Sequence, residues 1–439
     1  MSSLQLRIPA SVGDLVRRRR GWVSKGLWAV TDQGLFALSN FALNLLLARW
    51  LPQRDYGAFA VAFSVLLLMG TVHTALLSEP MLVFGPSRYR DSTAAYVRRL
   101  TPLHFVVTAG MSAALLLGLL VLTFVRPSSG WGPALAGLAV SAPAILFLWL
   151  MRRACYIEAR PHLAAAAGLA YALLIPAGML LLTHAGLLTG ASAFINLAVA
   201  SLLVAWWLKL RLGRSRAAPG TTFPSANVAT AHWGYGRWAL GSGLLGWVPG
   251  NLVVLALPLW HSLSDAATLR VATMLIMPVL QIEAALGTLL TPALVRARLS
   301  GELRSTASMA LILFSGFSFV YGPLVIGLGS RLAHWLFGGQ YQFGGVTLWL
   351  LAATPLFTAI SLVSSAVLRA LERPDRVLWT NVASTAVTCV IGLPLIWLWS
   401  VDGALGSVLL SAVTAAVLAT WAGHRLTEVR ASAAVAPSL

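Results

Sequence analysis

Acidic residues and cysteines are scarce in this sequence. Only 13 of its 439 residues are Asp or Glu, and charged residues of both signs make up 10% of the chain, against about 25% in an ordinary soluble domain. The two cysteines, Cys155 and Cys389, lie in separate segments, so neither a disulfide nor a cysteine-based metal site is predicted. With 58% hydrophobic residues, the chain lacks the polar surface that a water-soluble globule needs, and we expect it to reside in lipid.

Long apolar runs fill most of the chain. A spanning helix needs about 20 mainly apolar residues, because the hydrocarbon core of a bilayer is about 30 Å thick. Backbone groups in lipid must find their hydrogen-bond partners within the protein, which favours helices over open strands. The predicted fold is therefore an all-α integral membrane protein with about twelve transmembrane helices. The twelve segments are 26–49, 57–84, 101–125, 133–151, 162–183, 190–209, 238–260, 266–291, 306–330, 346–369, 378–399 and 403–424.

The positive charges alternate along these segments. All but five of the 31 Lys and Arg residues fall in alternate connections, the exceptions being Arg49, Arg54, Arg126, Arg270 and Arg331. Since Lys and Arg collect in cytoplasmic loops, this pattern predicts that both termini are cytoplasmic. The net charge of +18 then follows from membrane topology and from attraction to anionic lipids, and no nucleic-acid partner is predicted.

A long polar connection divides the helices into two sets of six. We predict a basic cytoplasmic segment at 1–25, a first lobe at 26–209, a cytoplasmic linker at 210–237, a second lobe at 238–424 and a tail at 425–439. Six helices per half give the two lobes a parallel orientation. Such repeats are related by an axis along the membrane normal, with a substrate path between them. The prediction is a central cavity between two lobes that alternate in access.

Several stretches of the first hundred residues resemble a known family. These are Trp28-Ala-Val-Thr-Asp32-Gln33-Gly34, then Leu47-Ala-Arg49-Trp50-Leu51-Pro52, Asp55-Tyr56-Gly57, Glu79-Pro80-Met81 and Gly85-Pro86-Ser87-Arg88. They are similar to the opening of bacterial polysaccharide and O-antigen flippases, which belong to the multidrug/oligosaccharidyl-lipid/polysaccharide exporter superfamily.

The resemblance implies a multi-pass transporter in the bacterial cytoplasmic (inner) membrane. It would move a polyprenyl-diphosphate-linked oligosaccharide from the inner to the outer leaflet, without a cofactor. The expected partners are this lipid-linked glycan, membrane lipids and other polysaccharide assembly proteins. Asp32 stands where some flippases of lipid-linked substrates carry an Arg.

Three acids and one histidine of interest fall inside predicted helices, where ionisable residues are costly and usually functional. Asp32, Glu79, Glu283 and His73 are therefore candidates to bind a coupling H+ or Na+; Glu283 and His73 are 210 positions apart, at equivalent depth in the two lobes. The alternative is structural: Asp32 and Glu79 pair with Lys25, Arg88 or backbone donors, and His73 bonds a neighbouring helix.

A diphosphate group requires cations, and Arg offers a forked pair of donors. Arg88, Arg296 and Arg369 border the predicted inner mouth, while Arg49 and Arg270 border the outer one. The alternative is that each only fixes topology or extends to lipid headgroups. Asparagine side chains in helix one are further candidates to bind sugar, or to bond neighbouring helices; they are Asn40 and Asn44.

Two other functional classes compete with a glycan flippase. An enzyme acting on the membrane surface would need sizeable outer loops with catalytic residues, and every outer connection is short, with no metal-ligand cluster or Ser/His/Asp set. We therefore predict no catalytic residues, no metal site and no enzyme activity. A cation-coupled multidrug extruder of the same superfamily also has twelve helices, and an acid in helix one suits it.

Overall fold

The computed structural model describes residues 12–125, 130–213 and 227–435, and their side chains except those of 12–26, Thr288 and 427–435. Parts of the predicted N-terminal segment, linker and tail (1–11, 214–226 and 436–439) therefore lie outside the described residues, as do Arg126 and the side chain of Lys25. Every element in the described part is helical.

The first seven helices form one bundle, the N-lobe. They are α1 (Val12–Trp50), a continuous rod of α2 (Gln53–His73), the π-helix η1 (Thr74–Ser78) and α3 (Glu79–Phe84), the short 3-10 turn η2 (Arg90–Ser92), α4 (Thr93–Val125), α5 (Gly132–Ile157), α6 (Pro161–His184) and α7 (Gly190–Leu212). The central helix is α5, which packs on α2, α4, α6 and α7. Its apolar side chains account for much of the N-lobe core.

The remaining helices form the C-lobe. They are α8 (Val228–Trp260), α9 (Leu263–Leu299), α10 (Leu303–Phe337), α11 (Gly345–Ala370), and a last segment of α12 (Pro374–Val387), the π-helix η3 (Thr388–Gly392) and α13 (Leu393–Val435). Non-helical dihedral angles at Trp399 and Ser400 break this last segment into two helices. The described ranges thus contain twelve helical rods, which confirms the predicted all-α plan and its number of helices.

The ends of several helices are set by recognisable local chemistry. Thr189 and Ser192 form a capping box at the start of α7, and Ser262 and Asp265 form another at the start of α9; each satisfies backbone N–H groups that a helix start leaves without partners. Gly338, with a left-handed φ of 67°, ends α10, where a side chain would be strained.

Ten segments of the described chain are long and apolar enough to cross a membrane, the last of them holding both rods of 374–426. The exception is α1, whose polar residues Asp32, Gln33, Asn40 and Asn44 lower its hydropathy. Polar side chains are tolerated at such depth when they face protein, and Asp32 and Asn44 are both buried.

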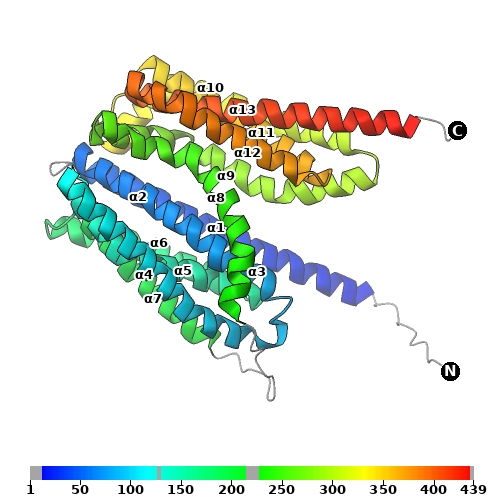
Figure 1. The fold of residues 1–439 in the computed structure, drawn as a ribbon, viewed down its shortest axis with the longest axis horizontal. Coiled ribbons are helices and arrows are strands. Elements are labelled where there is room, and N and C mark those ends of the chain that lie inside the picture. Colours follow the sequence, from blue (N-terminus) through cyan, green and yellow to red (C-terminus); the bar gives the residue numbers. More distant parts are fainter. Residues whose placement is uncertain (1–11, 126–129, 214–226, 436–439) are drawn as a thin grey trace.

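The alternation of the rods defines two ends of the molecule. The basic end carries both described chain ends and the connections at 85–92, 158–160, 300–302 and 371–373; the other is called here the opposite end. The lobes diverge toward the basic end in Figure 1, and the first half of α8 (green) extends between them. Contacts of α1 and α2 with α9 and α10 join the lobes.

Candidate functional site

Hydrogen bonds close the space between the lobes at the opposite end. The guanidinium of Arg49, at the end of α1, donates to the carbonyls of Trp335 and Leu336 in the last turn of α10, at 3.4–3.5 Å. The Gln340 amide donates to the Arg49 carbonyl at 2.9 Å, and the Gln53 amide donates to the Gln340 carbonyl. A cation near a helix C-terminus is electrostatically favourable. Arg49 therefore joins the lobes in this conformation.

A polar cluster lies deeper along the same interface. Its Arg270 is seven residues from the start of α9, which is about 10 Å at 1.5 Å per residue. Arg270 of α9 donates from Nε to Asn44 Oδ1 of α1 at 3.3 Å, and the Tyr56 hydroxyl of α2 donates to the same oxygen at 3.2 Å. The Arg270 guanidinium also lies 5.1 Å from the Phe63 ring centre. The structure thus brings together two predicted cavity residues, Asn44 of the N-lobe and Arg270 of the C-lobe.

No carboxylate neutralises Arg270 within the described part of the chain. The ion pairs found there involve other residues, and the ring of Phe63 compensates only part of the cost of a cation at membrane depth. Asn40, also predicted, donates to the Phe36 carbonyl of its own helix at 3.1 Å. The arrangement leaves Arg270 as a cation that an anionic ligand between the lobes is able to neutralise.

Asp32 is neutralised inside the N-lobe. Arg152 of α5 donates to Asp32 Oδ1 from Nε at 3.0 Å and from Nη2 at 2.8 Å, and the Tyr156 hydroxyl donates to Oδ2 at 2.6 Å. The guanidinium of Arg152 also stacks 3.9 Å from the Phe36 ring centre. Of the two predicted cationic partners, Arg88 instead lies over the Phe84 ring, and the side chain of Lys25 is outside the described residues.

A cavity of about 200 Å³ adjoins this ion pair, with Gln33, Thr74, Ser78 and Arg153 among its lining. Because both oxygens of Asp32 already accept hydrogen bonds, the pair forms one wall of the cavity as a neutral unit. Sequence reasoning missed Arg152 as the partner of Asp32, since the two are 120 residues apart. In the sequence, Arg152 follows the predicted segment 133–151 directly and stands beside Arg153, so it is counted only among the basic residues of a connection.

The predicted His73 lies in a buried histidine pair of the N-lobe. His104 Nε2 is 3.1 Å from the Pro143 carbonyl, so that nitrogen carries the proton and donates. His104 Nδ1 must then accept, and His73 Nε2, at 2.9 Å, donates to it. Two neutral rings satisfy this chain, and the remaining nitrogen of His73, Nδ1, is buried without a partner.

The two other predicted acids differ in their surroundings. Glu79, at the start of α3, accepts from the Tyr235 hydroxyl of α8 at 3.0 Å. Glu283 of α9 is buried and accepts from the Ser318 hydroxyl of α10 at 2.6 Å through Oε1. Its second oxygen, Oε2, is buried with no hydrogen-bond partner. Glu283 is thus placed to hold a proton or a small cation within the C-lobe.

The remaining predicted arginines lie at the basic end with exposed side chains; they are Arg88, Arg296 and Arg369. The ion pairs in this region involve their neighbours: Arg298 lies 2.9 Å from Glu372, and Arg373 and Arg376 pair with Asp375. The structure therefore does not gather these arginines with Arg270, which lies near the opposite end. Within the described residues no group of three or more His, Cys, Asp or Glu side chains is arranged to hold a metal ion.

The fold is similar to that of several solved membrane transporters. The chain superposes on an inward-facing multidrug resistance MATE family transporter of the MOP superfamily with a TM-score of 0.68 and 13% identity, over 91% of this chain and 98% of that one. An outward-facing transporter of the same description gives 0.63 and 14% identity, over 93% and 96%. The lipid II flippase MurJ, in an inward closed conformation, gives 0.69 and 10% identity, over 90% and 87%.

No family model and no curated protein matches the sequence. At these low identities the structural likeness shows the fold alone: a multi-pass membrane protein with the two-lobed architecture of MOP-superfamily transporters. It confirms the fold that the opening residues of the sequence implied.

Proposed function

We propose that this protein is a transporter that moves a polyprenyl-diphosphate-linked oligosaccharide from the inner to the outer leaflet of the bacterial cytoplasmic membrane by alternating access. The observation that supports it most is Arg270, a cation at the lobe interface with no carboxylate partner in the described chain. Asp32, which would repel an anion, is neutralised by Arg152. The interface is therefore suited to an anionic cargo, and the guanidinium fork matches diphosphate oxygens.

In the first half of the proposed cycle, the cargo enters from the basic end. There the lobes diverge in Figure 1, while Arg49, Gln53 and Gln340 hold them together at the opposite end. A lipid-linked diphosphate that enters from the basic end would displace Asn44 from Arg270. Opening of the opposite end, with the bonds of Arg49 broken, would then release it.

The test is transfer of a polyprenyl-diphosphate oligosaccharide in proteoliposomes, followed by access of a lectin to the sugar on each side. We expect the wild-type protein to move the glycan and Arg270→Gln to lose at least tenfold in rate. Arg270→Lys should also be impaired, because Lys keeps the charge without the fork. Arg331→Gln, which removes an exposed charge near the same end, is the matched control. Equal rates in all four proteins contradict the role of Arg270.

A cation-coupled multidrug extruder is the second candidate. The observation that favours it is Glu283, a buried carboxylate with one free oxygen, in a fold shared with multidrug transporters. Export of cationic dyes by cells that overproduce the protein, together with no glycan movement in the proteoliposomes, would support this alternative over the flippase.

A further inference from the structure

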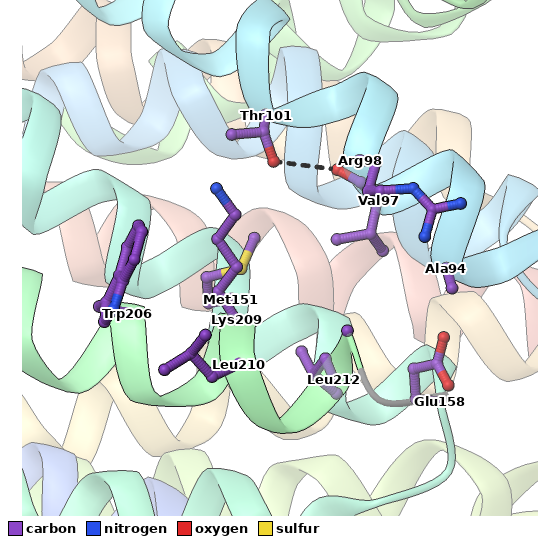
Figure 2. Close-up of a pocket in the computed structure, with 11 residues that line it drawn as sticks. Ala94, Val97, Arg98, Thr101, Met151, Glu158, Trp206, Lys209, Leu210 and Leu212 are labelled. Carbon is purple, nitrogen blue, oxygen red and sulfur yellow. Dashed lines mark hydrogen bonds between the residues drawn. The ribbon is translucent and has the colours of Figure 1, made fainter. Parts of the chain in front are cut away.

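A second cavity lies away from the lobe interface. It has a volume of about 410 Å³ and sits at the basic end of the N-lobe, between α4 and α7 and above α5 (Figure 2). Met151 of α5 forms its floor, and Val97 of α4 with Trp206 and Leu210 of α7 forms its apolar walls. We call this cavity the α4–α7 groove. Neither Arg270 nor the other proposed transport residues line it.

The groove belongs to a surface that faces lipid. Only 6% of the apolar stretch of α4 is buried inside the protein, so this helix lies on the outside of the N-lobe. Farther along the two walls, toward the opposite end, the apolar side chains of Phe105 on α4 and Leu202 on α7 are exposed. Each lies one helical turn from a lining residue, Thr101 or Trp206, and therefore on the same face. An apolar strip therefore continues from the groove into the depth of the bilayer, in the direction that an acyl chain takes.

Two cations mark the polar end of the groove. Arg98 lies in the second turn of α4 and Lys209 in the last turn of α7, both at the basic end. Lys209 extends from α7 toward the α4 side of the groove (Figure 2), past the ring of Trp206 at 5.3 Å. Glu158 also lines this end, and in the described part of the chain neither cation forms an ion pair with it or with another carboxylate.

The charge around the groove has one dominant sign. Arg99 and Arg211 follow the two lining cations closely in sequence, and Arg160 donates to the Arg211 carbonyl at 3.0 Å. Glu158 is the one carboxylate among the residues that line the groove, and Asp91 lies three residues before Ala94 at the same end. A ligand for this site must combine an anionic headgroup with long apolar chains, because the cations lie at one end and the apolar strip at the other.

We propose that the α4–α7 groove binds an anionic phospholipid from the leaflet at the basic end. Its phosphate lies between Arg98 and Lys209, and its acyl chains lie along Val97, Trp206 and Leu210. The proposal does not depend on the cargo of the transporter, since the groove lies on the outer side of the N-lobe and uses none of the residues assigned to transport.

The experiment is native mass spectrometry of the purified full chain with phosphatidylglycerol and, separately, with phosphatidylcholine. The wild-type protein should retain phosphatidylglycerol in preference. The double variant Arg98→Gln with Lys209→Gln should reduce that preference by roughly thirtyfold, given the usual strength of two cations near an anionic headgroup. The matched control is Arg99→Gln with Arg211→Gln, which removes the same charge from the same two helices without touching the groove, and it should bind as the wild type does.

Each other outcome overturns the proposal. No preference in the wild type removes the site, and equal losses in the two double variants show diffuse attraction rather than a groove. Displacement of the lipid by millimolar inorganic phosphate shows a site for free phosphate instead. The position of the acyl chains is checked with phosphatidylglycerol that is brominated in these chains and quenches nearby tryptophan fluorescence. Quenching should fall in Trp206→Phe and remain in Trp207→Phe. The reverse result contradicts the binding mode.

Discussion

At the scale of single residues, the ion pair of Asp32 and Arg152 lies in the interior of the N-lobe. Both side chains are more than 90% buried, and removal of one partner from a buried pair costs about 3–5 kcal/mol, because the other charge stays buried without compensation. Asp32→Asn should therefore lower the unfolding temperature of the purified protein in detergent markedly.

Two further variants make that measurement decisive. Asp91→Asn removes an exposed acid and should leave the unfolding temperature almost unchanged. The double variant Asp32→Leu with Arg152→Met replaces the whole pair by apolar side chains and should recover most of the loss. If Asp32→Asn unfolds at the same temperature as Asp91→Asn, the pair does not stabilise the lobe.

Glu283 supports a prediction about transport rather than stability. Glu283→Gln keeps the shape of the side chain and an acceptor for Ser318 but removes the charge that Oε2 would offer to a cation. We expect the variant to fold and to lose coupled transport, measured as cargo movement driven by an imposed proton or sodium gradient. Glu302→Gln, an exposed acid at the basic end, is the control. Unchanged transport by Glu283→Gln removes Glu283 from the coupling mechanism.

Many of these residues can be identified from the sequence, but the residues they contact cannot. Asp32, Glu79 and Glu283 can be identified because a charge inside a long apolar run is exceptional, and Arg270 because it borders the predicted outer mouth. Their partners are not visible, because the distance along the chain between Asp32 and Arg152, or between Glu79 and Tyr235, carries no information about helix packing. Which candidates share a surface follows only from the arrangement of the rods.

At the scale of elements, hydropathy predicts the number of helices better than their lengths. The predicted segments 101–125 and 266–291 belong to α4, which begins at Thr93, and α9, which continues to Leu299. The apolar run reports the part of a helix that lies in hydrocarbon, whereas the backbone continues as helix through the basic residues at its end. The π-helix η1, Thr74–Ser78, has no such signal at all.

The π-helix η1 is where α8 joins the N-lobe. His232 of α8 bridges two groups there: its Nδ1 lies 2.9 Å from the Leu76 carbonyl of η1, so this nitrogen donates, and its Nε2 accepts from the Tyr96 hydroxyl at 2.6 Å. Tyr235, one turn farther along α8, donates to Glu79. The first half of α8 is therefore held by the N-lobe, although the chain enters the C-lobe through its second half.

Substitution of His232 should release this half of α8. His232→Ala removes both hydrogen bonds and leaves the Leu76 carbonyl and the Tyr96 hydroxyl without partners, at about 1–3 kcal/mol for each buried group. We expect faster amide hydrogen exchange over 228–240 with little change in the C-lobe. Trp233→Ala, at the exposed neighbouring position, should not have this effect. Exchange that is as slow in His232→Ala as in the wild type contradicts the bridge.

At the scale of the whole molecule, the arginine distribution makes an orientation prediction. The basic connections share one end with both described chain ends, and that end should face the cytoplasm. In a Cys389→Ser background, which removes the exposed native thiol, Ser300→Cys should react with an impermeant maleimide only after the cells are opened. Leu187→Cys, at an exposed position of the opposite end, should react in intact cells. The reverse pattern inverts the topology.

Alternating access requires the two lobes to separate at the opposite end, where Arg49, Gln53 and Gln340 now connect them. Gln53→Cys with Gln340→Cys, bridged by a short reducible thiol cross-linker, should stop transport in proteoliposomes, and reduction should restore it. Thr347→Cys with Asp402→Cys joins two helices within the C-lobe, where the native side chains are 2.6 Å apart, and should permit transport. Both cross-links lie near the same end, but only the first joins the two lobes. A difference in transport between the two cross-linked proteins therefore reports movement between the lobes. Transport that persists in the first cross-linked protein excludes lobe separation as the release step.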